Sequence, residues 1–130
     1  VAGVVAMAAV PPKGCCIAGD YRVHFRAVAK SKCRHPGSGE YTLKLVQAKG
    51  CGPKLEGTAV RKSDGIKLAF TGSITGSTIK CCTVEGTFQE PSGAKFRIRV
   101  HFCWRKGVFS VKGTATRPDG CVSVWVLTRI

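Results

Sequence analysis

The sequence predicts an all-β protein: an antiparallel meander of about eight strands, arranged as a sandwich or a small up-and-down barrel and stapled by disulfides. From Tyr21 onward, apolar and polar residues alternate, and Gly, Pro, Asp or Ser interrupt the alternation roughly every ten residues. No stretch carries a capped helical stripe of apolar residues over three turns. Eight cysteines, an even number, lie among 130 residues. Short, evenly spaced strands joined by tight turns are typical of antiparallel sandwiches and barrels.

The chain opens with an apolar segment, Val1–Pro12, that contains no charged side chain. It is too short to span a bilayer as a helix, because a span needs about 20 apolar residues. Two roles fit its composition. The segment forms the first core strand of its own domain, or Val1–Val10 extends from the body and adds as a strand to a neighbouring subunit. We therefore separate residues 1–12 from a single domain at residues 13–130.

Alternation and turn residues predict eight strands along the rest of the chain. Their expected positions are residues 21–30, 40–48, 54–61, 66–74, 77–88, 95–105, 108–116 and 121–130. The clearest alternation lies in 95–105, where one face is wholly apolar and is assigned to the core. That face consists of Phe96, Ile98, Val100, Phe102 and Trp104.

An internal repeat supports hairpins independently of the alternation. A Gly-Thr pair begins at Gly57, Gly86 and Gly113, and each pair is followed by a turn that ends in Ser-Gly or Asp-Gly. We interpret each pair as the start of a strand, and the glycine that ends each turn as a residue with positive φ. The order of the cysteines, a doublet and two singles occurring twice, suggests an eroded duplication.

The cysteines predict four disulfides and an oxidising compartment. No C-x-x-C motif occurs and the three histidines show no ligand spacing, so we expect neither a metal nor a cofactor. Disulfides persist outside the cell, which favours a secreted or extracellular protein. The pairing stays open among the eight residues. They are Cys15, Cys16, Cys33, Cys51, Cys81, Cys82, Cys103 and Cys121.

The charge balance points to an anionic partner. The chain has 21 Lys and Arg against 7 Asp and Glu, a net charge of +14. Nucleic acid, acidic polysaccharide, an anionic membrane surface and an acidic protein would each suit this charge, and net charge alone does not choose among them. Scattered over the surface, the same cations would serve solubility alone.

Two rows of basic side chains are the candidate binding residues. On the strand at 95–105 the row lies opposite the core face, with cations about 6.5–7 Å apart, close to the phosphate or sulfate spacing of an extended polyanion. A second row lies on the strand at 21–30. If both strands share one sheet, the rows merge into a basic patch; otherwise they lie apart and are merely solvated. The candidates are Arg22, His24, Arg26, Arg97, Arg99, His101 and Arg105.

The sequence carries no catalytic motif: no G-x-S-x-G elbow, phosphate-cradling glycine loop or H-E-x-x-H helix occurs. We therefore expect no catalytic residues. The aromatic residues of 95–105 point away from the cations, which disfavours base stacking. The expected function is that of a non-enzymatic secreted protein that binds an anionic partner through a basic sheet face. The alternative is a self-assembling structural subunit joined by N-terminal strand addition.

Overall fold

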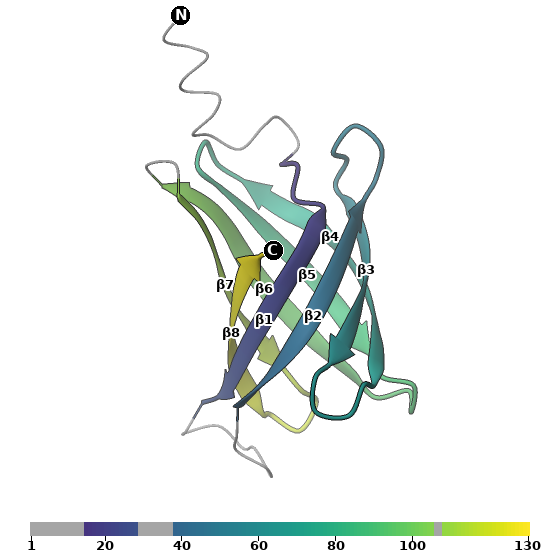
Figure 1. The fold of residues 1–130 in the computed structure, drawn as a ribbon. Coiled ribbons are helices and arrows are strands. Elements are labelled where there is room, and N and C mark those ends of the chain that lie inside the picture. The colour runs from purple at the N-terminus through teal and green to yellow at the C-terminus, as the bar shows by residue number, and fades with distance from the viewer. Residues whose placement is uncertain (1–14, 29–37, 106–107) are drawn as a thin grey trace, which may run out of the picture.

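The computed structural model describes residues 15–28, 38–105 and 108–130. Within these ranges, eight antiparallel strands pair in sequence order and close into one barrel, because β1 pairs with both β2 and β8 (Figure 1). The strands are β1 (Gly19–Ala27), β2 (Ser38–Gln47), β3 (Lys54–Arg61), β4 (Lys67–Ser77), β5 (Cys81–Gln89), β6 (Lys95–Arg105), β7 (Val108–Thr116) and β8 (Val122–Arg129). The predicted eight-stranded meander is confirmed, and of the two expected architectures the barrel is the one that forms.

The described residues contain no helix long and apolar enough to cross a bilayer. The predictions for Val1–Pro12, as a first strand or as an exchanged strand, concern residues that lie outside the described ranges.

The boundary between β4 and β5 was predicted wrongly. The prediction placed residues 77–80 in a strand, whereas β4 ends at Ser77 and β5 begins at Cys81. Thr78 closes a tight turn there: its N–H donates to the Cys81 carbonyl (2.8 Å), and its Oγ1 accepts from the Cys81 N–H (3.0 Å). A threonine and an isoleucine continue the apolar and polar alternation in sequence, so the pattern hides this turn.

Side chains fill the barrel interior. Phe96, Ile98, Val100 and Phe102 are buried, and Trp104 packs against the core at its margin, as the alternation predicts. An eight-stranded barrel is just wide enough for its inward side chains. Accordingly, only about 20 Å³ stays empty in mid-barrel, beside Trp125 and its neighbours. A ligand site in the described structure must therefore lie at a barrel end or on the outer surface.

The repeated Gly-Thr pairs lie inside β3, β5 and β7, so the interpretation of these pairs as strand starts is wrong. Close packing is the reason for the glycines. A Cβ at Gly86 would lie 2.5 Å from the Phe70 ring, and one at Gly113 would overlap the Arg99 carbonyl oxygen. The turn glycines behave as predicted: Gly65, Gly93 and Gly120 have φ values of 73°, 92° and 90°.

A plug of residues 15–18 (the N-terminal plug) seals one end of the barrel. Ile17 is wholly buried, and its N–H donates to Gln47 Oε1 at 2.9 Å. Gln47 Nε2 in turn donates to the Cys15 carbonyl at 2.7 Å, and the Tyr21 hydroxyl donates to the Ile17 carbonyl at 2.6 Å. Backbone groups that enter the barrel are therefore satisfied by side chains of β1 and β2.

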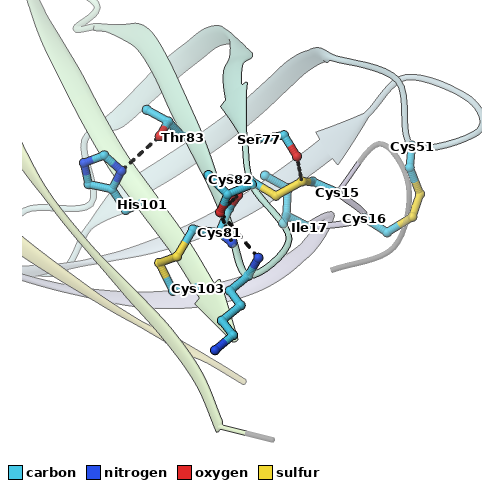
Figure 2. The surroundings of a disulfide bond; sticks show 12 residues. Cys15, Cys16, Ile17, Cys51, Ser77, Cys81, Cys82, Thr83, His101 and Cys103 are labelled. Carbon is cyan, nitrogen blue, oxygen red and sulfur yellow. Dashed lines mark hydrogen bonds between the residues drawn. A yellow bond between two sulfur atoms is a disulfide. The ribbon is translucent and has the colours of Figure 1, made fainter. Parts of the chain in front are cut away.

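Disulfides fix the plug to the strands around it (Figure 2). The bonds are Cys15–Cys82, Cys16–Cys51 and Cys81–Cys103. Because Cys15 and Cys16 are adjacent, as are Cys81 and Cys82, the bonds join the β2–β3 loop, the plug, β5 and β6 in one chain of links. Cys121 is also disulfide-bonded, and Cys33 lies outside the described residues.

Candidate functional site

The basic row on β6 lies on the outer surface, opposite the core face. Arg97, Arg99 and His101 are exposed. Arg97 lies between threonines of β5 and β7, and Arg99 lies between Glu85 and Thr114. Glu85 accepts a hydrogen bond from Thr75 Oγ1 at 2.8 Å, and no ion pair within the described ranges includes Arg97 or Arg99. Both guanidinium groups are therefore free to bind an anion.

The last two candidates of this row, His101 and Arg105, add less to the site. His101 Nδ1 lies 3.0 Å from the Thr83 hydroxyl, so this imidazole already has a hydrogen-bond partner. Arg105 is the last residue of β6, and its side chain lies outside the described part of the structure.

The row on β1 is partly neutralised. Arg22, His24 and Arg26 are exposed on the outer surface, and His24 Nδ1 lies 3.3 Å from Glu40 Oε1. Lys62 Nζ donates to Glu40 Oε2 at 3.1 Å. This hydrogen bond, together with the positive charges of Lys62, His24 and Arg22, lowers the pKa of Glu40. Glu40 therefore stays ionised and offsets part of the row's charge.

The two rows share the closed sheet but do not adjoin, which corrects the expectation of a single merged patch. Closure places β7 and β8 between β6 and β1. Across these strands His101 pairs with Lys112, Lys112 with Val126, and Val126 with His24. With neighbouring strands about 4.8 Å apart, the rows are separated by about 14 Å along the barrel surface.

The surface between the rows is apolar and basic rather than acidic. Val124 and Val126 of β8 are each 40% exposed, and the exposed Lys112 of β7 adds a cation. We call the whole surface, from β6 through β7 and β8 to β1, the basic face. Its members are Arg22, Arg26, Arg97, Arg99, Lys112, Val124 and Val126. Lys112 was missed from the sequence because it belongs to no row of cations on its own strand.

A second polar cluster lies at the barrel end opposite the plug, which we call the mouth. Three hairpin turns, β3–β4, β5–β6 and β7–β8, meet there (Figure 1). Each is closed by a backbone hydrogen bond that the N–H of its first residue donates. The bonds run from Arg61 N to Ile66 O, from Glu90 N to Ala94 O and from Arg117 N to Cys121 O.

The first residues of these turns form a charged network. Arg117 Nη2 lies 3.4 Å from Glu90 Oε1, and Arg61 Nη1 lies 3.8 Å from the same oxygen. Arg61 also donates to both carboxylate oxygens of Asp64, with a shortest distance of 2.8 Å. That contact is the main reason why the pKa of Asp64 is lowered and that of Arg61 is raised.

Aromatic side chains lie beneath the charged network. Tyr41 and Trp125 stack with their centroids 5.3 Å apart, and Arg117 Cζ lies 5.0 Å from the centroid of the Phe96 ring. Burial raises the pKa of Tyr41, and the positive charge of Arg61, which also hydrogen-bonds the Tyr41 hydroxyl, partly opposes this rise. The mouth encloses a cavity of about 530 Å³. Its geometry can hold a small molecule with an apolar body and a polar head.

A repeated sequence pattern relates the three residues of this network, although it was not recognised as a predictor of their contact. Arg61, Glu90 and Arg117 each follow a repeated glycine by four positions, in G-T-x-x-R, G-T-x-x-E and G-T-x-x-R. Equivalent positions of a structural repeat lie at equivalent places in a barrel. Opposite charges at one repeat position therefore predict a contact.

Within the described ranges, no three His, Cys, Asp or Glu side chains are grouped so that they could hold a metal ion. No family model matches the chain, and no curated protein matches it. Among solved structures, the chain is similar to a redesigned β-barrel: the TM-score is 0.58 at 17% sequence identity, over 87% of this chain and 90% of that one. At this identity the likeness shows the fold alone, and it agrees with the closed antiparallel barrel described above.

Proposed function

We propose that the protein is a non-enzymatic, secreted binding protein that engages an anionic polymer through the basic face. One observation carries the proposal: Arg22, Arg26, Arg97, Arg99 and Lys112 are exposed, and none forms an ion pair within the described ranges. Exposed cations on a sheet repel one another, and a bound polyanion relieves that repulsion while releasing its own counterions.

The chemistry of the face favours an acidic polysaccharide over nucleic acid bases. The aromatic residues are buried or partly buried, and Phe25, which lies beside Arg26, packs inward against Tyr41 and Trp125, so the face presents no fully exposed ring for base stacking. Sulfate or carboxylate groups need only cations at suitable spacing, which the arginines of β6 provide. The disulfides fit an oxidising environment. Acidic polysaccharides are found in that environment and carry the charge opposite to that of the basic face.

Self-assembly by strand addition is the second candidate, and the barrel gives it less support. Each described strand is hydrogen-bonded to a neighbour on both sides, so the described sheet presents no free edge. A strand supplied by another subunit would have to displace one that is already paired.

Charge reversal on the basic face tests the proposal. The double variant Arg97→Glu/Arg99→Glu is compared with Lys54→Glu/Lys67→Glu, which makes the same charge change on β3 and β4. We expect affinity for heparin at physiological salt to fall about tenfold or more in the first variant and about threefold or less in the second. Isothermal titration calorimetry measures both, and circular dichroism confirms folding.

Two results would overturn the proposal. Equal losses in the two variants would mean that heparin responds to net charge and not to the basic face. Wild-type binding that persists unchanged at high salt would mean that ionic contacts do not hold the polymer.

A further inference from the structure

The mouth is a hollow at the end of the barrel that the plug does not fill. The plug seals the opposite end, and mid-barrel is filled by side chains. At the mouth, by contrast, about 530 Å³ is empty beside Phe25 and Ala27 of β1 and Ala115 of β7. Small residues at Ala27 and Ala115 leave this space open, because neither side chain reaches the axis.

The inner wall of the mouth is apolar and rigid. The Phe25 ring lies 5.1 Å from the Tyr41 ring at a tilt of 31°, and Tyr41 stacks on Trp125. Trp125 Nε1 donates to Ser123 Oγ at 2.9 Å, which fixes the plane of the indole. A flat apolar group that entered the mouth would meet ring faces and edges that are already held in place.

The rim has hydrogen-bond donors that no described residue accepts. Arg61 is committed to Asp64 and Tyr41, and the Asp119 carboxylate accepts the Cys121 N–H at 2.9 Å. Among the described residues, the Arg117 guanidinium has one hydrogen-bond acceptor, Glu90, although it carries five N–H groups. Its side chain is 39% exposed and lies over Phe96, so its free N–H groups lie at the edge of the cavity.

We propose that the mouth binds a small amphiphilic anion: a flat apolar body lies against Tyr41 and Trp125, and one carboxylate or sulfonate accepts hydrogen bonds from Arg117. Arg61 positions the rim and does not contact the head group, because Asp64 and Tyr41 hold it. The excess positive charge of the protein draws such an anion toward the barrel, in spite of the rim's own acidic residues. This site is separate from the basic face.

Naphthalene-2-carboxylate is a suitable probe, and its neutral amide is the matched control. The chain has two tryptophans, and Trp104 lies near the opposite end, beside Phe109. In a two-dimensional NMR titration, we expect the Trp125 indole N–H resonance to shift saturably with the carboxylate while that of Trp104 stays in place. The amide is expected to bind about tenfold more weakly or worse.

Two variants that lose the same charge distinguish binding at the mouth from a general effect of net charge. Arg117→Gln should weaken carboxylate binding about tenfold, whereas Arg22→Gln, which removes the same charge from the basic face, should change it less than twofold. Ala27→Phe should block the mouth; if this variant does not fold, Arg117→Gln decides alone. Heparin affinity should be the same in Arg117→Gln as in the wild type, which distinguishes failure here from failure of the proposed function.

The proposal is overturned if the amide binds as tightly as the carboxylate, if Arg117→Gln and Arg22→Gln behave alike, or if Trp104 responds and Trp125 does not.

Discussion

Gly113 shows how a single residue determines the packing between neighbouring strands of the barrel. It lies between Val100 and Trp125 in the register of β6, β7 and β8. Without a side chain at this position, β7 can approach the Val100 backbone closely. The glycine therefore serves packing, although the sequence pattern suggested a strand start.

We predict that Gly113→Ala destabilises the protein by about 1–3 kcal/mol, because the added methyl group overlaps β6 backbone atoms. Urea denaturation followed by Trp fluorescence measures the effect. Gly76→Ala is the control, since a Cβ there meets nothing closer than Thr83 at 3.7 Å. Similar losses in both variants would show that reduced backbone freedom, and not overlap, decides the outcome.

At the residue scale, local alternation predicted which side chains enter the core but not which surface residues meet. Phe96 and its neighbours on 95–105 were assigned correctly because the period of two is a property of one strand. Lys112 reaches the basic face only because β7 pairs with β6 in one register, with Lys112 beside His101. That register depends on the β6–β7 connection and on core packing together, and neither is visible in a single strand.

Among the elements, the N-terminal plug is the one that alternation did not predict. Side-chain hydrogen bonds hold it in place: one from Tyr21, two through Gln47 and one from Arg129. These bonds join residues far apart in sequence, such as Ile17 and Gln47, so no local sequence pattern predicts them. The strands, in contrast, were predicted to within a few residues, because turn glycines such as Gly93 and Gly120 mark the hairpin ends locally.

The plug predicts a fall in stability at high pH. Burial raises the pKa of Tyr21 to about 12, and the charge of Arg129 only partly opposes this rise. In the unfolded chain a tyrosine has a pKa near 10. Between these values the unfolded chain loses the proton and the barrel keeps it, so the free energy of unfolding decreases as pH rises from about 10 to about 12, by up to about 2–3 kcal/mol.

Urea titrations from pH about 9 to about 12 test this prediction. Tyr21→Phe removes the ionising hydroxyl, so its free energy of unfolding should fall less steeply over the same window, although the hydrogen bond to Ile17 is also lost. Tyr41, whose pKa is raised as well, is present in both proteins and cancels in the comparison. Equal slopes for the two proteins would contradict the role of Tyr21.

Over the whole molecule, closure of the barrel decides how surface charge is organised. The rows on β1 and β6 were found from the sequence, but their separation was not, because it follows from β8 pairing back to β1. Closure also leaves the aromatic residues buried or partly buried, and it leaves Val124 and Val126 exposed between the rows. The result is a broad basic face with a weakly apolar centre, suited to contact with a flexible anionic chain.

The most direct test is NMR mapping of a heparin hexasaccharide on the isotope-labelled, oxidised protein. Our account predicts that the largest backbone amide shifts occur at Arg97, Arg99, Lys112 and Val126, and that they diminish as salt is added. Shifts concentrated on β3 and β4, or spread evenly over all eight strands, would contradict it.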